Sequence, residues 1–267
     1  MAEIEFIPSL WAGAVLNALQ KKTVFESLCN KDYAGEIKKG NTLKIATVDN
    51  PTVKDYTKGG DIEYEEIEGT DQSLIIDQQK YFAFKVDDIT AVQSNIGLLE
   101  AATSGAGFAL ADSLDTFLAD LIKTDGTTKT VNAGATADSG LELISEIAAI
   151  LDKAKAPDGG RWFAMPIDLS KMVMLDIAGK LTNNTGIITS GYMGSVFGVN
   201  LYKSANLTVP LYGHVSAVTV ASQIDKTEAV RLSNTFANGI RGLHVYGAKV
   251  TRPTLCGKVT IPAKNNP

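Results

Sequence analysis

The chain has 267 residues, enough to bury one large hydrophobic core or two smaller ones. Its composition is that of an ordinary globular protein, with 45% hydrophobic and 21% charged residues, and its net charge is −5. That charge argues against a dedicated nucleic-acid-binding protein, which would carry a basic face and a high pI.

The cysteines and the N-terminus predict a soluble protein made in a cytoplasm. Cys29 and Cys256 stand at opposite ends of the sequence, and without a secretory signal they indicate reduced thiols rather than a disulfide framework. The first eight residues carry Glu3 and Glu5 and lack a basic segment followed by an apolar one. No run approaches the ~20 apolar residues of a membrane span, so we expect no membrane partner.

Residues 1–45 are expected to form an arm that contains an amphipathic helix. Pro8 and Ser9 precede apolar residues at helical spacing, which is typical of a helix with proline near its first turn. The apolar side of this helix is expected to pack on the chain's own body or on a neighbouring subunit. Its candidate packing residues are Trp11, Leu16 and Phe25.

The next stretch predicts a long two-stranded arm. Thr42 to Val48 and Lys80 to Val86 alternate like strands. Between them, the polar segment 49–72 carries eight acidic residues against Lys54 and Lys58 alone. An isolated hairpin is marginal in water, so it would need a partner surface. A solvated acidic loop is equally favoured by composition alone. The candidate contact residues are Asp55, Asp61, Glu63, Glu65, Glu66 and Glu68.

A long helix is predicted from about Asp88 to Lys123. Apolar residues recur in steps of three or four, as one stripe along a helix requires. At about 1.5 Å per residue this helix would span roughly 50 Å. Lys123 and the following Gly126 mark its end. We interpret it as a spine on which other elements rest; the stripe comprises Ile89, Val92, Ile96, Leu99, Thr103, Ala106, Leu110, Leu114, Phe117 and Leu121.

Beyond a flexible connection at 124–138, the sequence alternates between helices and strands. Ser139 and Glu142 have the spacing of a capping box, which predicts a helix that ends before the turn at 157–160. The expected later elements are a short buried strand at 161–165, a helix capped by Asp168, strands at 196–202 and 215–221, and two strands within 239–261 that are separated at Arg252 and Pro253.

Signatures of catalysis and of cofactor or metal binding fail on inspection. Residues 35–42 resemble a phosphate loop, but Asn41 stands where the phosphate-binding Lys is needed, and Gly105-Ala106-Gly107 does not follow a strand. His214 and His244 each lie alone in strand-like runs, which favours ordinary sheet residues over metal ligands. The carboxylates at 61–71 lack the EF-hand pattern and are interpreted as exposed charge. We therefore expect no cofactor and no metal, and no convergent polar cluster points to an enzyme.

Three segments resemble tailed-bacteriophage major capsid proteins of the Hong Kong 97 type, especially those related to the coat proteins of short-tailed phages. DQQKYFAFKVDDI at 77–89 resembles their junction between extended loop and spine helix. GSVFGVNLYKSANL at 194–207 resembles their glycine–aliphatic–Ser-x-Asn segment, and FANGIRGLHVYGAKVTRP at 236–253 resembles the segment that returns to the peripheral domain. These segments and their order span most of the chain.

This resemblance implies an α+β fold with four parts. They are an N-terminal arm at 1–45, an extended β-hairpin loop at 46–84, a peripheral domain with the spine helix at 85–124 and 236–267, and an axial α/β domain at 125–235. It implies a non-enzymatic subunit that forms hexamers and pentamers, which close into an icosahedral shell around double-stranded DNA.

The resemblance also implies partners and a location. The acidic loop would lie across an adjacent subunit, and the arm residues Lys21 and Lys22 are candidates for non-specific contact with packaged DNA. No long scaffolding segment precedes the arm helix, so we expect a separate scaffolding protein, together with a portal and, in some shells, a decoration protein. The expected location is the virion capsid, assembled in the cytoplasm of a bacterial host.

Two alternatives remain open at this stage. One is an encapsulin-type subunit, with the same fold but enclosing protein cargo. The other is a cytoplasmic α/β enzyme that uses the carboxylates at 61–71, which predicts a small soluble oligomer instead of a shell.

Overall fold

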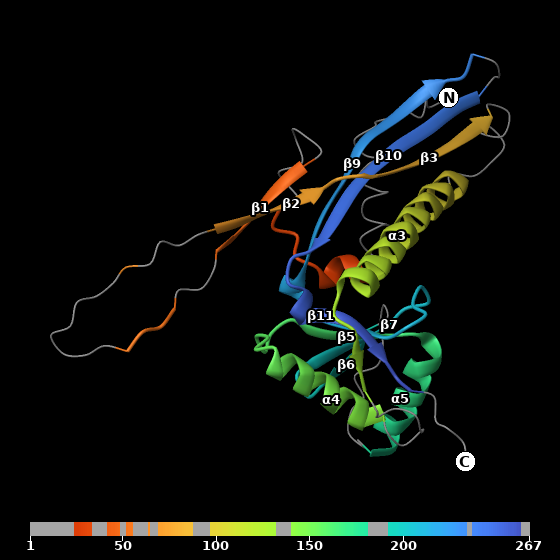
Figure 1. Cartoon of the computed structure of the whole chain (residues 1–267). Helices are drawn as coiled ribbons and strands as arrows, with labels where there is room; N and C mark the ends of the chain where they lie inside the picture. The colour runs from red at the N-terminus through yellow and green to blue at the C-terminus, as the bar shows by residue number, and fades with distance from the viewer. Residues whose placement is uncertain are drawn as a thin grey trace.

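The computed structural model describes most of the chain and shows an elongated molecule built on two sheets (Figure 1). A three-stranded sheet and the long helix α3 form one end, and a six-stranded sheet with α4 and α5 forms the other. The described residues are 24–33, 42–48, 52–55, 64, 69–87, 97–131, 140–180, 192–233 and 237–262.

The β1–β2 hairpin projects to one side, near the place where the two sheets meet (Figure 1). β1 (Thr42–Val48) pairs antiparallel with β2 (Gly69–Ile75), so that Thr42 faces Ile75 and Val48 faces Gly69. The strand predicted at 42–48 is therefore confirmed. The returning strand β2 was missed, because its polar residues were taken for part of the acidic connection.

The second predicted strand of the arm lies in a different sheet. It forms part of β3 (Gln78–Asp87), which pairs antiparallel with β10 (Ala237–Val250). β10 pairs in turn with β9 (Val218–Arg231), which gives the order β3-β10-β9. Residues 80–86 thus serve the body of the protein, and the strand of the hairpin is supplied by 69–75.

The long helix α3 (Gly97–Asp125) packs against the three-stranded sheet. Phe117 lies edge-on to Tyr246 of β10, with 5.4 Å between ring centroids, and Ser113 Oγ is 3.2 Å from the Tyr246 hydroxyl. Of the predicted stripe, Leu110 and Leu114 are buried, while Phe117 and Leu121 are half-buried. The most buried row continues instead through Leu118 and Ile122. The predicted first part, 88–96, lies outside the described residues.

The six-stranded sheet has the order β4-β11-β8-β5-β7-β6. Its central strand β5 is buried along its whole length, as predicted for the strand at 161–165. The sheet is mixed, with β5 parallel to β7 and antiparallel to β8. Its strands are β4 (Lys129–Thr130), β5 (Arg161–Met165), β6 (Tyr192–Val196), β7 (Val199–Lys203), β8 (Leu211–His214) and β11 (Cys256–Thr260).

The two strands predicted near the C-terminus are confirmed, but they belong to different sheets. β10 lies in the three-stranded sheet and β11 in the six-stranded sheet, with the short helix η3 (Pro253–Leu255) between them. The strand predicted at 215–221 begins late, because residues 215–217 form the helical turn η2 before β9 starts at Val218. The strand predicted at 196–202 is the second half of a hairpin that turns at Phe197 and Gly198, whose φ angles are 52° and 74°.

Helices α4 (Gly140–Lys153) and α5 (Ile167–Lys180) pack on each other beside the six-stranded sheet. The amide of Leu141, in the first turn of α4, donates to Asp176 Oδ2 of α5 at 2.8 Å. A carboxylate at a helix N-terminus satisfies an amide that has no partner in its own helix. Asp176 thus caps α4 from a neighbouring helix, whereas Ser139, the predicted cap, lies outside the described residues. Asp168 lies inside the first turn of α5.

One hydrophobic core runs from α3 into the six-stranded sheet, and it includes Leu114, Leu118, Trp162 and Tyr212. A second, much smaller cluster lies beneath the β1–β2 hairpin and consists of Leu43, Ile45, Leu74, Ile76 and Ala221, with Tyr33 and Val245 packed against it. The two ends of the molecule therefore share one core, while the hairpin is held by few apolar contacts.

Candidate functional site

The predicted contact residues of the arm and loop fall largely outside the described residues. Phe25 is described and is completely buried, in the short helix η1 (Phe25–Leu28). Asp55 is exposed, and two apolar side chains of the same loop are almost fully exposed, Val53 at 97% and Tyr64 at 93%. The predicted residues outside the described part of the chain are Trp11, Leu16, Lys21, Lys22, Asp61, Glu63, Glu65, Glu66 and Glu68.

A buried carboxylate on α3 holds the end of the arm in place. Asp115 Oδ2 accepts from the Val24 amide at 2.8 Å, and Oδ1 accepts from the Phe25 amide at 3.0 Å. These are the amides at the start of η1, which has no side-chain cap of its own. Burial raises the pKa of Asp115 to about 6; the amides of Val24, Phe25 and Glu26 oppose this rise, and the charge of Glu26 adds to it.

The same segment touches both sheets. Phe25 lies edge-on to Trp162 of β5, with 6.2 Å between ring centroids. Five residues later, the Asn30 amide donates to the Val218 carbonyl of β9 at 2.8 Å, and the Val220 amide donates back to the Asn30 carbonyl at 2.9 Å. Residues 24–30 therefore join α3, the three-stranded sheet and the six-stranded sheet.

Further titratable groups lie beside this segment. Glu26 is buried and forms an ion pair with Lys31 at 3.2 Å. Burial lowers the pKa of His244 to about 4, and the nearby Glu26 opposes this shift. His244 Nε2 is 3.1 Å from Ser222 Oγ, and its Nδ1 is a buried nitrogen without a hydrogen-bond partner among the described residues. A neutral imidazole is consistent with this environment.

Two histidines and two cysteines were the residues most open to a chemical role, and their surroundings indicate structural ones. His214 Nδ1 accepts from the Ser216 amide at 3.1 Å, which leaves Nε2 to donate to the Gly159 carbonyl at 2.6 Å. Burial raises the pKa of both free cysteines, that of Cys256 to about 12. Protonated, buried thiols are poor nucleophiles. Within the described residues, no three His, Cys, Asp or Glu side chains could hold a metal ion.

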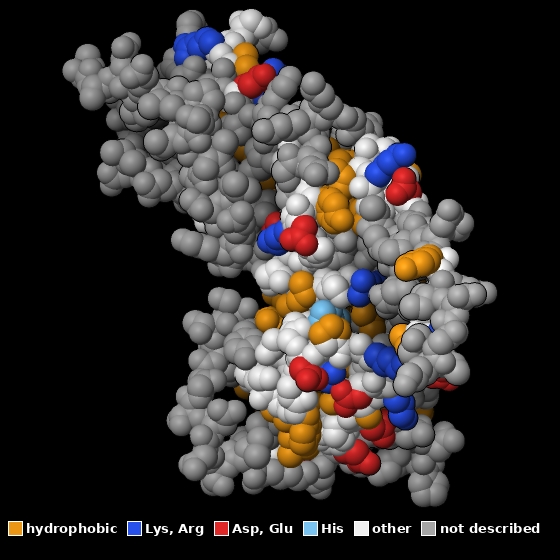
Figure 2. All heavy atoms as spheres, turned by 90° about the vertical axis from the view of Figure 1, so that its left-hand side faces the viewer, with side chains coloured by type: hydrophobic (Ala, Val, Ile, Leu, Met, Phe, Trp, Pro, Cys, Tyr) orange, Lys and Arg blue, Asp and Glu red, His pale blue; other side chains and the backbone are white. Residues whose placement is uncertain are grey.

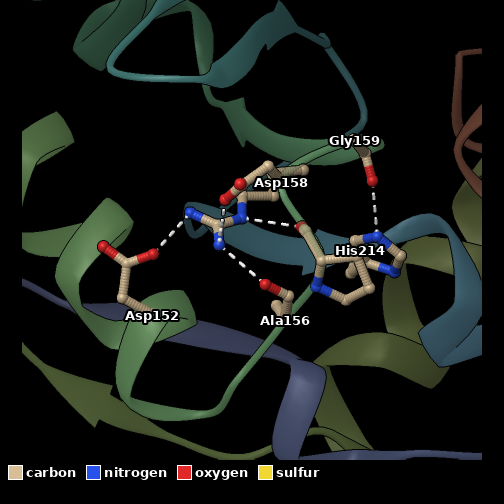
Figure 3. A network of polar contacts seen from close by, with 7 residues as sticks. Asp152, Ala156, Asp158, Gly159 and His214 are labelled. Atoms are coloured by element: carbon tan, nitrogen blue, oxygen red, sulfur yellow. Dashed lines mark hydrogen bonds and ion pairs between the residues drawn. The ribbon is translucent and has the colours of Figure 1, made fainter.

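An extensive polar network surrounds Arg161 of β5 (Figure 3). Its guanidinium contacts Asp152 at 2.7 Å and Asp158 at 3.0 Å. It also donates to the Ala156 carbonyl at 2.7 Å and the Pro157 carbonyl at 2.8 Å. Every partner lies at the end of α4 or in the turn that follows it. The network therefore holds this turn against the sheet. The charged groups of the network are paired with one another, which indicates a structural role.

An open surface lies on the face of the three-stranded sheet that turns away from α3. We call it the outer sheet face. Arg241 of β10 donates twice to Glu228 Oε2 of β9, at 3.1 and 2.6 Å, and two shallow grooves of about 520 and 320 Å³ meet beside it. Tyr81 is 78% exposed there and Val230 is 37% exposed. The outer sheet face comprises Tyr81, Ala83, Lys85, Glu228, Val230, Arg241 and Leu243.

Charges of both signs are mixed on the face of the molecule shown in Figure 2. Among the described side chains, Lys and Arg lie next to Asp and Glu over the lower part, with apolar side chains between them. On this face, the described side chains form no extended patch of one sign, such as a polyanion-binding surface would present. In addition, no helix of the described chain is long and apolar enough to cross a membrane.

Sequence reasoning missed three of these features. Asp115 interrupts the apolar face of α3 between Ala111 and Ala119, so a lone acid in the buried row was the signal. For Arg161, the signal was a charged residue at the start of a strand that is otherwise apolar. The outer sheet face left no local signal, because it combines residues from three strands that lie far apart in the sequence.

Solved structures of other proteins share this fold. A search of curated proteins found no match. A solved structure of Mycobacterium phage Che8 is 32% identical over 97% of this chain and 94% of that chain, with a TM-score of 0.70. The capsid of cyanophage P-SCSP1u is 15% identical over 90% and 88%, with a TM-score of 0.70. A virus-like particle from Pyrococcus furiosus is 9% identical over 95% and 99%, with a TM-score of 0.61. The last two show a likeness of fold alone.

The model of a family described as phage capsid protein matches residues 71–258, which is more than half of the chain. This family and the Che8 match indicate a structural, non-enzymatic role and a place in the capsid of a virion. The chain belongs to the phage capsid protein family and is a bacteriophage shell protein.

Proposed function

We propose that this chain is the major capsid protein of a tailed phage, and that its copies form hexamers and pentamers that close into an icosahedral shell around double-stranded DNA. The observation that carries the proposal is the projecting β1–β2 hairpin. It rests on a small apolar cluster, and Val53 and Tyr64 between its strands are almost fully exposed. An element of this kind gains stability when a second subunit covers it.

In this proposal the chain has the four parts of the Hong Kong 97-type fold. Residues 1–45 are the arm, 46–84 the extended loop, 85–124 and 236–267 the peripheral domain with α3 as spine helix, and 125–235 the axial domain. Three strands cross these bounds: β3 and β9 pair with β10 and so join the peripheral part, and β11 pairs with β8 and so joins the axial part. The continuous core between α3 and the six-stranded sheet supports the view that the peripheral and axial parts act together within one subunit.

The extended loop contacts the outer sheet face of an adjacent subunit. Between β1 and β2, the loop carries five more acidic than basic side chains, from seven acids and two lysines. The outer sheet face offers Lys85 and the exposed guanidinium of Arg241 beside apolar grooves. Opposite charges fix register and orientation, while Val53 and Tyr64 supply apolar area. Asp55, Asp61, Glu63, Glu65, Glu66 and Glu68 are the proposed acidic contacts.

The arm completes the set of proposed contacts. Trp11 and Leu16 pack on the body or on a neighbour, and Phe25 anchors the end of the arm in the core. Lys21 and Lys22 touch packaged DNA without sequence preference. A separate scaffolding protein and a portal act in assembly within the bacterial cytoplasm, and decoration proteins join some shells.

The first test is electron microscopy of the protein, expressed alone and with its scaffolding partner. Closed shells with hexameric and pentameric units are expected, with density for nucleic acid inside those recovered from infected cells. A small uniform oligomer under both conditions would contradict the proposal. Shells filled with protein instead would support a compartment subunit, which the shared fold of the Pyrococcus furiosus particle leaves open.

Charge reversal tests the loop contact. Changing Glu63, Glu65 and Glu66 to Lys is expected to block shell formation, while the isolated subunit keeps its circular dichroism spectrum and its unfolding midpoint. Changing Lys85 and Arg241 to Glu in the same chain is expected to restore assembly, because both sides of the contact are reversed. The control is Lys123→Glu, at the end of α3 and away from the outer sheet face. Rescue by this control, or normal shells from the triple variant, would rule out the proposed contact.

A further inference from the structure

The segment from Val24 to Asn30 is attached to the rest of the subunit through three separate contacts. Its first amides donate to Asp115 on α3, Phe25 packs on Trp162 in the six-stranded sheet, and Asn30 exchanges two hydrogen bonds with β9 of the three-stranded sheet. It therefore bridges the two sheets at the point where the arm enters the body. We call this segment the clip.

The strongest polar contact of the clip depends on one ionisable group. Asp115 is 4% exposed, and the described part of the chain contains no ion pair to it. The nearby charged group on the clip itself is Glu26, an acid, whose ion pair is with Lys31 rather than with Asp115. An ionised carboxylate at this position is thus held by backbone amides of the clip and not by a cation, in a site that disfavours charge.

We propose that the clip is a proton-sensitive fastening between the arm and the two sheets, closed most firmly when Asp115 is protonated and opened more readily when Asp115 is ionised. Opening breaks the hydrogen bonds to Asp115 and those between Asn30 and β9, and it separates Phe25 from Trp162. It frees the entry of the arm without requiring either sheet to unfold.

The direction follows from the two states of the carboxyl group. In the closed state, burial raises the pKa of Asp115 to about 6, whereas a carboxyl exposed by opening returns to its ordinary value of 3.8. The closed state therefore binds the proton more tightly, and acidification from pH 7 to pH 5 favours closure. Linkage gives a change of about tenfold in the closed-to-open ratio over this range.

The other titratable groups around the closed clip do not reverse this pH dependence of the closed-to-open ratio. His244 of β10 has its pKa lowered to about 4, so it remains neutral from pH 5 to pH 7. The thiols of Cys29 on the clip and Cys256 on β11 have raised pKa values and remain protonated. Lys31 stays paired with Glu26. Complete unfolding also exposes His244, which then binds a proton more readily, so through this group acidification favours unfolding. The sign of the pH dependence therefore distinguishes local opening of the clip from complete unfolding.

Amide hydrogen exchange of the unassembled subunit from pH 5 to pH 7.5, corrected for intrinsic exchange rates, tests the proposal. The amides of Val24, Phe25 and Val220 report on the clip, because each is bonded across it. Their opening equilibrium is expected to rise about tenfold from pH 5 to pH 7. The Ser204 amide, which donates to the Met165 carbonyl within the six-stranded region, serves as a reference and is expected to stay level.

Asp115→Asn identifies the responsible group, because it removes the titration and retains an oxygen acceptor. In this variant the pH dependence at the clip amides is expected to disappear. Asp120→Asn, at an exposed acid on the same helix, is the matched control and is expected to keep it. A level profile in the native protein, or an unchanged slope in Asp115→Asn, would overturn the proposal. If Asp115→Asn does not fold, a carbon-13 NMR titration of the Asp115 carboxyl in the native protein tests the proposal instead. A titration midpoint near pH 4 would refute the proposal.

Discussion

The clip and the β1–β2 hairpin are both short segments that leave the body of the subunit, and they are held in opposite ways. The clip buries Phe25 completely and satisfies its first amides with a carboxylate. The hairpin covers only a small apolar cluster, and the side chains described between its strands are exposed. The first arrangement stabilises the subunit by itself. In the proposed assembly, the second gains its stability from a neighbouring subunit, so that one chain could fold alone and still assemble.

The largest expected loss of stability comes from removing the buried aromatic ring of the clip. Phe25→Ala removes a fully buried ring from its contact with Trp162 and leaves a cavity, at a cost of about 4 kcal/mol in the free energy of unfolding. Urea unfolding followed by circular dichroism measures it. A loss below about 1 kcal/mol would mean that the clip contributes little to the fold.

A smaller but still large loss is expected at Arg161. Arg161→Ala leaves the Ala156 and Pro157 carbonyls without their donor, at a cost of about 3 kcal/mol in the free energy of unfolding. Arg241→Ala is the control, because it also breaks an arginine–carboxylate pair, but at an exposed site where pairs contribute at most about 1 kcal/mol. Equal losses of unfolding free energy in the two variants would show that the buried arginine contributes no more to stability than the exposed one.

His244 is expected to give the subunit a dependence on pH in the acidic range. Its pKa is lowered to about 4 by burial, so the stability that depends on neutral His244 is fully present above about pH 6.5. It is lost as pH falls toward 4, to a total of about 3 kcal/mol. Urea unfolding of the native protein and of His244→Gln at pH 7, 6 and 5 measures the difference between them. A constant difference across this range would contradict the shift. Comparing the two proteins cancels the opposite contribution of Asp115.

The smallest expected effect on folding lies in the hairpin. Tyr64→Ser removes a side chain that is 93% exposed, so the free energy of unfolding should change by less than about 0.5 kcal/mol. Shell formation, followed by light scattering, should nevertheless slow or fail, because the apolar contact with the neighbour is lost. Thr52→Ser, at another exposed loop position, is the matched control. Normal assembly of Tyr64→Ser would remove Tyr64 from the proposed contact.

Periodicity predicted the positions of many elements but not which elements meet. The strands at 42–48 and 161–165, the two strands near the C-terminus and most of α3 were found from local patterns, since alternation and helical spacing are properties of neighbouring residues. The pairing of 42–48 with 69–75 was missed. The partner of a strand depends on distant residues, and β2 has mainly polar side chains because one of its faces is exposed.

The sequence by itself therefore determined the order of the helices and of most longer strands, the acidic character of the loop and, through matching segments, the capsid family. Only the tertiary structure decided that Asp115 caps the clip, that Asp176 caps α4, and that Tyr81, Arg241 and Glu228 share one face. In each case the partners are separated by 35 residues or more, or lie on three different strands. Such contacts depend on long-range packing, which no local pattern of residues records.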